Sequence, residues 1–426
     1  MSGQFTKEYL KELQGYPLSV KVQLTKQRIR EWVHKYGEDG VYVSFSGGKD
    51  STVLLHLVRE MYGDVIPGVF VDTGLEYPEI RSFVKGFDNI VWLKPKKNFR
   101  KVIEDYGYPF ISKEVSECVY AAKKYLTEVL QELGSDRQTD RQTDRQTDRQ
   151  TDRQTDRQTD SSGISGITRS TVSYADWAST QSLENSTELL NILKRDQGKR
   201  PTFRLARMLG MLTVDGQYQT RKNIPSKNRS MFAQRKYKFF LEPDAPTISN
   251  RCCTVMKKEP AHRYSRETGR MPMTAEMASE SRIRTQKWLQ NGCNGFDMVN
   301  PKSTPMAFWT EQDVLLYIYM NQIQIASVYG NVVKENEVDG QLDFADIDLF
   351  DLGRPILKTT GCNRTGCMFC GYGCHLEPEG EGRFERLKIT HPKIYDYIMR
   401  PWEEGGLNYK EVIDWINEHG NLHIKY

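Results

Sequence analysis

The segment that most constrains this chain joins a short apolar strand to a glycine-rich turn and an amphipathic helix. It reads Val41-Tyr-Val-Ser-Phe-Ser46-Gly47-Gly48-Lys49-Asp50-Ser51-Thr52 and continues as Val53-Leu-Leu-His-Leu-Val58. Adjacent glycines let a backbone turn tightly and direct its N–H groups at an anion, and the N-terminus of the following helix adds partial positive charge. The segment therefore predicts a phosphate-binding loop. The alternative is a tight turn that binds no ligand.

The surrounding pattern predicts strands that alternate with helices. We expect a helix over 17–36, a strand over 41–45, a helix to about residue 61, a strand over 65–71, a helix after Pro78 and a strand over 90–93. Such alternation implies parallel pairing, so we expect an α/β fold with a doubly wound parallel sheet of the Rossmann type. Ligands bind beyond the carboxyl ends of the strands in such sheets. The second strand ends at Asp72 and Thr73, which we therefore expect beside the loop.

Length and composition exclude several classes of protein. The 426 residues can bury a large core and hold two or three domains. No apolar run approaches the roughly 20 residues of a membrane span, and the first residues form no apolar signal segment. We therefore expect a cytoplasmic protein without a membrane partner. A formal net charge of +4 is too small to indicate nucleic-acid binding by itself.

Two segments differ in composition from the rest of the chain. The tetrapeptide Asp-Arg-Gln-Thr occurs six times in register between Asp136 and Thr159, and because it has no apolar residue it cannot build a core. Residues 195–238 are basic with interleaved aromatic side chains, a composition that fits a nucleic-acid backbone, a solvated charged face, or a nucleotide or sulfate substrate.

These shifts divide the chain into consecutive segments. We expect the N-terminal part of an α/β domain (1–130), a disordered low-complexity insertion (131–185), a basic segment (186–240), the second part of the α/β domain (241–330) and a cysteine-rich metal-binding and helical C-terminal region (331–426).

Eight cysteines without a signal segment indicate metal ligands or reactive thiols rather than disulfides. Cys252 and Cys253 are adjacent and stand beside Lys257 and Lys258. Positive charge of this kind lowers the pKa of a thiol. Four further cysteines lie close together, at Cys362, Cys367, Cys370 and Cys374.

The motifs taken together resemble a known family. The loop lacks the four residues that an ordinary P-loop places between its first glycine and Gly-Lys, whereas Ser-Gly-Gly-Lys-Asp-Ser is similar to the PP-loop of the ATP pyrophosphatases. The motifs D-T-G-x-E-x-P, C-C-x-x-x-K, A-x-E-S-x-x-R and W-T-x-x-D-V follow it in order. This series resembles the phosphoadenosine phosphosulfate (PAPS) reductase family, which has the adenine nucleotide α-hydrolase fold. The resemblance covers about residues 20–120 and 235–375.

The resemblance implies roles for particular residues. The loop would bind the phosphates of the nucleotide through Ser46, Gly47, Gly48, Lys49, Asp50 and Ser51. Asp72 and Thr73 would lie near its sugar or base, and Arg282 and Arg284 would bind the substrate anion, which suits the forked guanidinium. With Lys49 and Asp50, these arginines form the expected catalytic set. As a residue of an exposed loop, Lys49 should contribute little to the core.

The resemblance also implies a metal centre, for which two cysteine sets are open. Cys252 and Cys253 with Cys367 and Cys370 resemble the ligands of adenylylsulfate reductases that carry a [4Fe–4S] cluster, and we prefer this set. The local set of Cys362, Cys367, Cys370 and Cys374 has spacings that suit a ferredoxin-like cluster or a structural zinc. In the preferred set, Cys362 and Cys374 would be available to carry sulfur.

Two departures from the family bear on the reaction. Sulfonucleotide reductases lack the loop lysine, which this chain retains, and they end in a Glu-Cys-Gly-Leu-His segment that is absent here. We therefore expect a PP-loop enzyme that binds ATP or a related adenine nucleotide with Mg²⁺, adenylylates an acceptor and supports thiolation. A nucleic-acid acceptor and a sulfur or electron donor protein are the expected partners. The alternatives are a sulfonucleotide reductase and a non-catalytic module that senses nucleotide or binds nucleic acid.

The repeat leads to a first prediction. Deletion of residues 136–160 should leave the melting temperature and nucleotide binding nearly unchanged, because shortening a flexible loop changes its closure entropy by only about 0.6 kcal/mol per halving. Thermal unfolding of the full and shortened chains measures this. A large loss of melting temperature would mean that the repeat packs against the rest of the protein.

Overall fold

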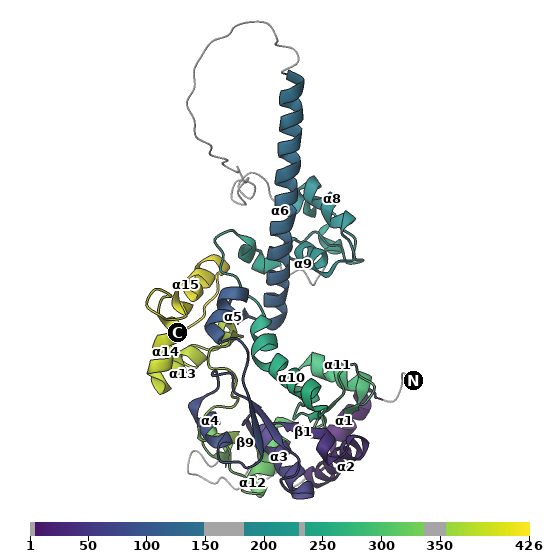
Figure 1. The fold of residues 1–426 in the computed structure, drawn as a ribbon, viewed down its shortest axis with the longest axis vertical. Helices are drawn as coiled ribbons and strands as arrows, with labels where there is room; N and C mark the ends of the chain where they lie inside the picture. The colour runs from purple at the N-terminus through teal and green to yellow at the C-terminus, as the bar shows by residue number, and fades with distance from the viewer. Residues whose placement is uncertain (1–4, 149–182, 230–234, 336–354) are drawn as a thin grey trace. The chain divides into compact units, whose positions relative to one another are not determined.

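The computed structural model of the chain describes residues 5–148, 183–229, 235–335 and 355–426, with the backbone alone over 132–148 (Figure 1). The chain forms two compact units. Unit 1 comprises Met1–Lys101 and Cys253–Cys370, and unit 2 comprises Val102–Cys252 and Gly371–Tyr426. Each unit thus combines stretches that are far apart in the sequence.

Unit 1 is built on a six-stranded sheet with the order β3-β2-β1-β5-β7-β6. Its strands are β1 (Val41–Ser44), β2 (Gly68–Val71), β3 (Ile90–Leu93), β5 (Met271–Met273), β6 (Asn294–Gly295) and β7 (Lys302–Ser303). All neighbouring pairs are parallel except β6 with β7. The mostly parallel sheet confirms the expected α/β class. The chain runs outward from β1 on both sides, so the strand order reverses at β1.

The expected strands and helices of the first hundred residues are present with small changes. The strand expected over 65–71 begins only at Gly68, because Pro67 has no N–H group to donate to a neighbouring strand. The helices of unit 1 are α1 (Lys7–Gly15), α2 (Leu18–Tyr36), α3 (Lys49–Tyr62), α4 (Pro78–Val84), α10 (Glu259–Thr268), α11 (Arg282–Asn291) and α12 (Glu311–Met320). Helices α2 and α3 pack against β1, and α10 packs against β2 and β3.

Shorter elements complete unit 1. They are the 3-10 helices η1 (Glu38–Gly40), η7 (Ala278–Glu280) and η8 (Ser327–Tyr329), the π-helix η6 (Cys253–Lys258), and the antiparallel pair of β8 (Val332–Lys334) with β9 (Leu357–Thr359). Helix α5 (Phe99–Tyr106) begins in unit 1 and ends in unit 2.

A buried ion pair fixes α2 to α12 in the core of unit 1. Lys21 Nζ lies 2.6 Å from Asp313 Oδ2, and the two side chains are 0% and 2% exposed. Asp313 also accepts hydrogen bonds from the N–H and hydroxyl groups of Thr310, which is the N-cap of α12. Beside it, Trp309 Nε1 donates to Thr25 Oγ1 at 2.8 Å.

Unit 2 is mainly helical. Its elements are β4 (Phe110–Ile111), α6 (Lys113–Asp148), η2 (Leu183–Asn185), α8 (Thr187–Arg195), α9 (Arg200–Leu209), η3 (Arg221–Asn223), η4 (Ser226–Asn228), η5 (Arg235–Leu241), β10 (Gly371–Tyr372), η11 (Cys374–Leu376), α13 (Arg383–Thr390), α14 (Pro392–Met399) and α15 (Tyr409–Gly420). Helix α6 packs against α9 and η5. Strand β10 pairs in parallel with β4, and the ring of Phe110 contacts those of Phe384 and Tyr409, which also contact each other.

The insertion expected from residue 131 begins as helix rather than as irregular chain. Helix α6 continues through Asp148 and includes the first three repeats. The four-residue charge period is close to one helical turn, which allows the helix to propagate from the packed segment before it. Residues 149–182 lie outside the described residues. Neither α6 nor any other described helix combines the length and apolar character needed to cross a membrane.

The buried ion pair leads to a stability prediction. Lys21→Met should lower the free energy of unfolding by about 3–5 kcal/mol, because it leaves the carboxylate of Asp313 buried without its cation. Lys26→Met is the control, since the Lys26–Glu60 pair is partly exposed and should contribute at most about 1 kcal/mol. Urea unfolding of both variants measures the difference, and equal losses would contradict this account of α2 and α12.

Candidate functional site

The glycine-rich loop connects β1 to α3 at the point where the strand order reverses. Gly47 has φ +70°, a conformation that residues with a Cβ rarely adopt. A Cβ at Gly47 would lie 2.7 Å from Val84 Cγ2 and 2.8 Å from Ile80 Cγ2. The glycine is therefore required both by the turn and by the close packing of the loop on α4. This geometry directs the N-terminus of α3 at the carboxyl edge of the sheet.

The hydroxyl groups of the loop stabilise its own backbone in this structure. Ser46 N donates to Ser51 Oγ at 3.2 Å, and the two serine hydroxyls lie 3.0 Å apart. Ser51 and Thr52 both donate to the carbonyl oxygen of Gly48. These contacts preform the turn from which a phosphate could be bound.

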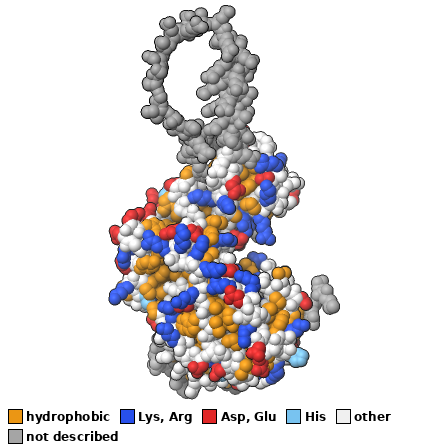
Figure 2. Space-filling model, in the orientation of Figure 1, with side chains coloured by type: hydrophobic (Ala, Val, Ile, Leu, Met, Phe, Trp, Pro, Cys, Tyr) orange, Lys and Arg blue, Asp and Glu red, His pale blue; other side chains and the backbone are white. Residues whose placement is uncertain are grey.

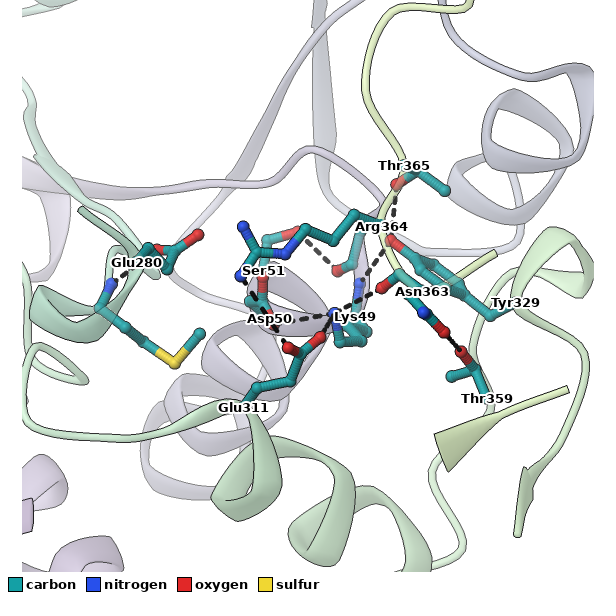
Figure 3. Close-up of polar contacts among 12 residues, drawn as sticks. Lys49, Asp50, Ser51, Glu280, Glu311, Tyr329, Thr359, Asn363, Arg364 and Thr365 are labelled. Carbon is teal, nitrogen blue, oxygen red and sulfur yellow. Dashed lines mark hydrogen bonds and ion pairs between the residues drawn. The ribbon is translucent and has the colours of Figure 1, made fainter. Parts of the chain in front are cut away.

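Lys49 is buried, with 3% of its surface exposed, so the expectation of an exposed loop lysine is wrong. Its ammonium group donates to the carbonyl oxygen of Asn363 at 2.9 Å and lies 3.0 Å from Glu311 Oε1 and 3.9 Å from Asp50 Oδ1 (Figure 3). Glu311 and Asn363, which lie far from Lys49 in the sequence, contact its side chain and help to bury it. The position of Lys49 in the sequence gives no indication of these contacts.

Tyr329 of η8 forms part of the same site. Its hydroxyl accepts a hydrogen bond from Lys49 N at 3.2 Å and lies 2.5 Å from Thr365 Oγ1. Burial raises the pKa of Tyr329, so the phenol is protonated at neutral pH.

Sequence reasoning missed Glu311, Tyr329, Asn363, Arg364 and Thr365. The available signals were the position of Glu311 inside the W-T-x-x-D-V motif and the place of 363–365 just before Cys367. Neither signal indicates contact with the loop, because the contacts depend on the tertiary fold.

Asp50 is the partly buried carboxylate that follows Lys49 in the loop. Burial raises its pKa, against the charges of Lys49, Arg364 and Arg284, which lower it. Glu311 adds to the rise. Within the described part of the chain, its Oδ1 atom is buried and has no hydrogen-bond partner. The side chain therefore has unused capacity to accept a donor or a cation.

Asp72 and Thr73 follow β2, which pairs with β1, so they lie at the sheet edge that carries the loop. Asp72 Oδ2 accepts from Arg81 Nη2 at 2.8 Å, and Thr73 Oγ1 donates to Glu76 at 2.7 Å. Both side chains are buried. Their predicted role at the sugar or base stays a prediction.

The two predicted anion-binding arginines begin α11. Arg284 forms an ion pair with Glu280, and its charge acts on Asp50, which places it on the loop side of unit 1. Arg282 is exposed in the first turn of the helix. The structure thus brings Arg284 toward the loop and leaves Arg282 at the surface.

Neither of the two cysteine sets belongs to a single unit. Among the residues described, no group of three or more His, Cys, Asp or Glu side chains is arranged to hold a metal ion. Of the preferred set, Cys253, Cys367 and Cys370 belong to unit 1 and Cys252 to unit 2; of the local set, Cys374 belongs to unit 2.

The individual thiols have other partners. Cys374 Sγ donates to the carbonyl oxygen of Gly371 at 2.7 Å, and Lys257 donates to Cys367. Burial raises the pKa of Cys367 to about 11, although Lys257 opposes the shift. At Cys367, burial therefore outweighs the effect of the neighbouring cation on the pKa, and the depression expected at Cys252 and Cys253 stays a prediction. Neither a [4Fe–4S] cluster nor zinc has a ligand group among the described residues, so the metal centre stays a prediction and we derive no step through it.

Much of the basic segment is paired within unit 2. Glu184 binds Arg235 and Lys238, and Arg204 and Arg207 pair with acids of α6, Glu117 and Glu114. On the face drawn in Figure 2, Lys and Arg side chains are interspersed with acidic and hydrophobic ones. These pairs favour a structural role for part of the segment, and nucleic-acid binding stays a prediction.

The pKa shift of Asp50 leads to a pH-dependent prediction. Folding raises the pKa of Asp50. Protonated Asp50 therefore favours the folded chain at pH values below the unfolded-state pKa of about 3.9, and this contribution to stability is lost as the pH rises through the folded-state pKa. Asp50→Asn should therefore be more stable than the unaltered chain at pH 7, and the gain should vanish near pH 4. Melting temperatures across this range measure it.

The matched control is Asp64→Asn, which removes a more exposed carboxylate paired with Arg59 and should change stability by no more than about 0.5 kcal/mol. A loss of stability in Asp50→Asn at pH 7 would show that the carboxylate supports the loop.

Comparison with known proteins finds short similarities. The chain is 40% identical over 73 residues to an uncharacterised protein of Methanocaldococcus jannaschii, 34% identical over 86 residues to a probable FAD synthase of Caenorhabditis briggsae, and 35% identical over 86 residues to a glutamine-hydrolysing GMP synthase of Cytophaga hutchinsonii. These segments cover 16%, 19% and 19% of this chain and only 15%, 16% and 17% of the respective relatives. The chain therefore spans a small part of each relative.

The family comparison covers much more of the chain. The sequence model of the phosphoadenosine phosphosulfate reductase domain matches residues 40–162 and 212–372, which together make up more than half of the chain. These ranges include the loop, β1 and α3, Arg282 and Arg284, Glu311 and the segment 363–365. The chain thus belongs to the phosphoadenosine phosphosulfate reductase domain family.

Proposed function

We propose that the protein is a nucleotide-activating enzyme that uses ATP to adenylylate an acceptor and then supports its thiolation. The observation that carries this proposal is the position of Lys49, at the N-terminus of α3 within a preformed glycine-rich turn. Backbone N–H groups and a cation at a helix N-terminus stabilise phosphate charge. The PP-loop lysine distinguishes the loop from that of an enzyme that splits no triphosphate.

The proposed reaction has two displacements. An acceptor oxygen attacks the α-phosphorus of ATP, and pyrophosphate leaves with the electron pair of the broken P–O bond. Lys49 stabilises the negative charge of the leaving pyrophosphate at the loop. A sulfur nucleophile then displaces AMP from the adenylylated acceptor. Arg284 and Arg282 would orient an anionic group of the acceptor or of the nucleotide through their guanidinium groups.

Mg²⁺ is expected to accompany the nucleotide, where it neutralises phosphate charge. Asp50 fits a role beside it, because its Oδ1 atom is buried without a hydrogen-bond partner among the described residues. Asp72 and Thr73 remain the proposed contacts to sugar or base. A nucleic-acid acceptor, a sulfur or electron donor protein and a cysteine-held [4Fe–4S] cluster or zinc also remain proposals. Iron, sulfide and zinc analysis of anaerobically purified protein tests the metal.

Reduction of a sulfonucleotide is the second candidate, and the family match favours it. It predicts release of sulfite from a phosphosulfate without release of pyrophosphate from ATP. A non-catalytic nucleotide sensor or nucleic-acid-binding module would release neither product. The two assays therefore separate all three functions.

The loop lysine provides the central test. Lys49→Gln should reduce ATP-dependent pyrophosphate release by about 100-fold or more, since loss of one donor to developing charge typically costs about 2.7–4 kcal/mol of transition-state stabilisation. Lys26→Gln is the control for charge, because Lys26 pairs with Glu60 of α3. Pyrophosphate release is measured with a coupled phosphate assay.

Because Lys49 is buried, the melting temperature of Lys49→Gln must be measured alongside. Undiminished pyrophosphate release in a folded variant would remove the catalytic assignment of the loop.

A further inference from the structure

A short segment of the chain forms the wall opposite the glycine-rich loop. Cys362 N donates to Val328 O at 3.0 Å and Gly361 N donates to Tyr329 O at 2.8 Å, which holds this segment beside η8. The pair of β8 with β9 anchors it just before these contacts. The wall that follows consists of Asn363, Arg364 and Thr365.

This wall faces the loop closely. A Cβ at Gly48 would lie 3.2 Å from the Tyr329 hydroxyl and 3.7 Å from Thr365 Oγ1. The carbonyl oxygen of Asn363 accepts a hydrogen bond from Lys49. An anion at the loop would therefore lie next to residues 363–365.

Glu311 is placed between two cations from different walls of the site. Its Oε1 atom lies 3.0 Å from Lys49 Nζ and its Oε2 atom lies 3.9 Å from Arg364 Nη2. Figure 3 shows the three side chains converging, with Glu311 rising from the first turn of α12. The Glu311 and Arg364 side chains are 38% and 60% exposed, so both can move.

We infer that Arg364 is a second phosphate ligand and that Glu311 is an internal anion, which holds Lys49 and Arg364 until the diphosphate of the nucleotide replaces it. This inference rests on the proposed function, because it assigns the phosphate-binding residues of the same site.

The physical argument is one of charge and geometry. A carboxylate and a phosphate present similar oxygen acceptors to a cation, and a guanidinium binds either in a forked arrangement. A diphosphate carries more charge than one carboxylate and also uses the N–H groups of the loop, so it competes successfully for both cations. Asp50 and Glu311 balance Lys49 and Arg364 in the structure, and displacement of Glu311 leaves a net cationic site.

Glu311 and Arg364 could instead form an ordinary surface ion pair with no role in binding. The two readings predict opposite behaviour for Glu311→Gln. An internal anion competes with ligand, so its removal strengthens binding. A supporting residue stabilises the loop, so its removal weakens binding or leaves it unchanged.

Titration calorimetry of the full chain with inorganic pyrophosphate at fixed salt tests the inference. Glu311→Gln should tighten binding about threefold, because pyrophosphate then no longer has to displace a carboxylate whose ion pairs are partly exposed. Arg364→Ala should weaken binding about tenfold or more, as expected for a charge-assisted hydrogen bond, and Arg364→Lys should restore part of the loss.

The controls make the same charge changes elsewhere in unit 1. Glu60→Gln removes an acid paired with Lys26 near the far end of α3, and Arg266→Ala removes an exposed partner of Glu259 on α10. Both substitutions should leave the affinity for pyrophosphate nearly unchanged, because salt screens the interaction of a distant surface charge with the ligand. Unfolding curves confirm that each variant is folded.

The outcomes separate this inference from the proposed function. If the unaltered chain binds pyrophosphate but Glu311→Gln binds it no more tightly, or Arg364→Ala binds it equally well, this inference is overturned and the proposed function stands. If the unaltered chain binds neither pyrophosphate nor ATP, both are overturned.

Discussion

The site depends on one backbone constraint: Gly47 has a positive φ and packs directly on α4. The turn must reverse direction between β1 and α3 while the loop stays in contact with Val84 and Ile80, and there is no room for a Cβ. Because the turn is this tight, α3 starts directly at the edge of the sheet and presents its N-terminal N–H groups there. The burial of Lys49, the position of Asp50 and the contact with Tyr329 all follow from where α3 begins.

The loop also concentrates charge in a partly buried place, and the structure compensates for it locally. Lys49 is surrounded by a carbonyl oxygen and two carboxylates, and Asp50 retains a buried oxygen without a hydrogen bond among the described residues. A buried cation needs such partners, whereas a carboxylate in this position is destabilised by desolvation. Arg364, which lies 3.9 Å from Glu311, brings the number of cations to two and balances the two carboxylates. The raised pKa of Asp50 shows that burial destabilises its charged form.

Local sequence features predict the elements of the first hundred residues well. Helix α2 and strand β3 occupy the expected residues, because periodicity and apolar runs are local signals. Strand β2 begins later than the apolar run predicts. The run begins at Val65, but Pro67 cannot donate a backbone hydrogen bond, so pairing begins only after it. The insertion was expected to be irregular from residue 131, but α6 carries its helix into the repeat.

The second wall of the site could not be predicted in this way. Lys49 contacts Asn363, which is 314 positions away in the sequence, and Tyr329 and Glu311 come from elements with no phosphate-binding motif of their own. What brings them to the loop is the sheet order, in which β5 and β7 from the second half of the chain pair beside β1. Sequence motifs can identify the half of a site that is continuous along the chain. The half that closes over it depends on sheet topology, and for this reason motif analysis misses Glu311, Tyr329 and Asn363.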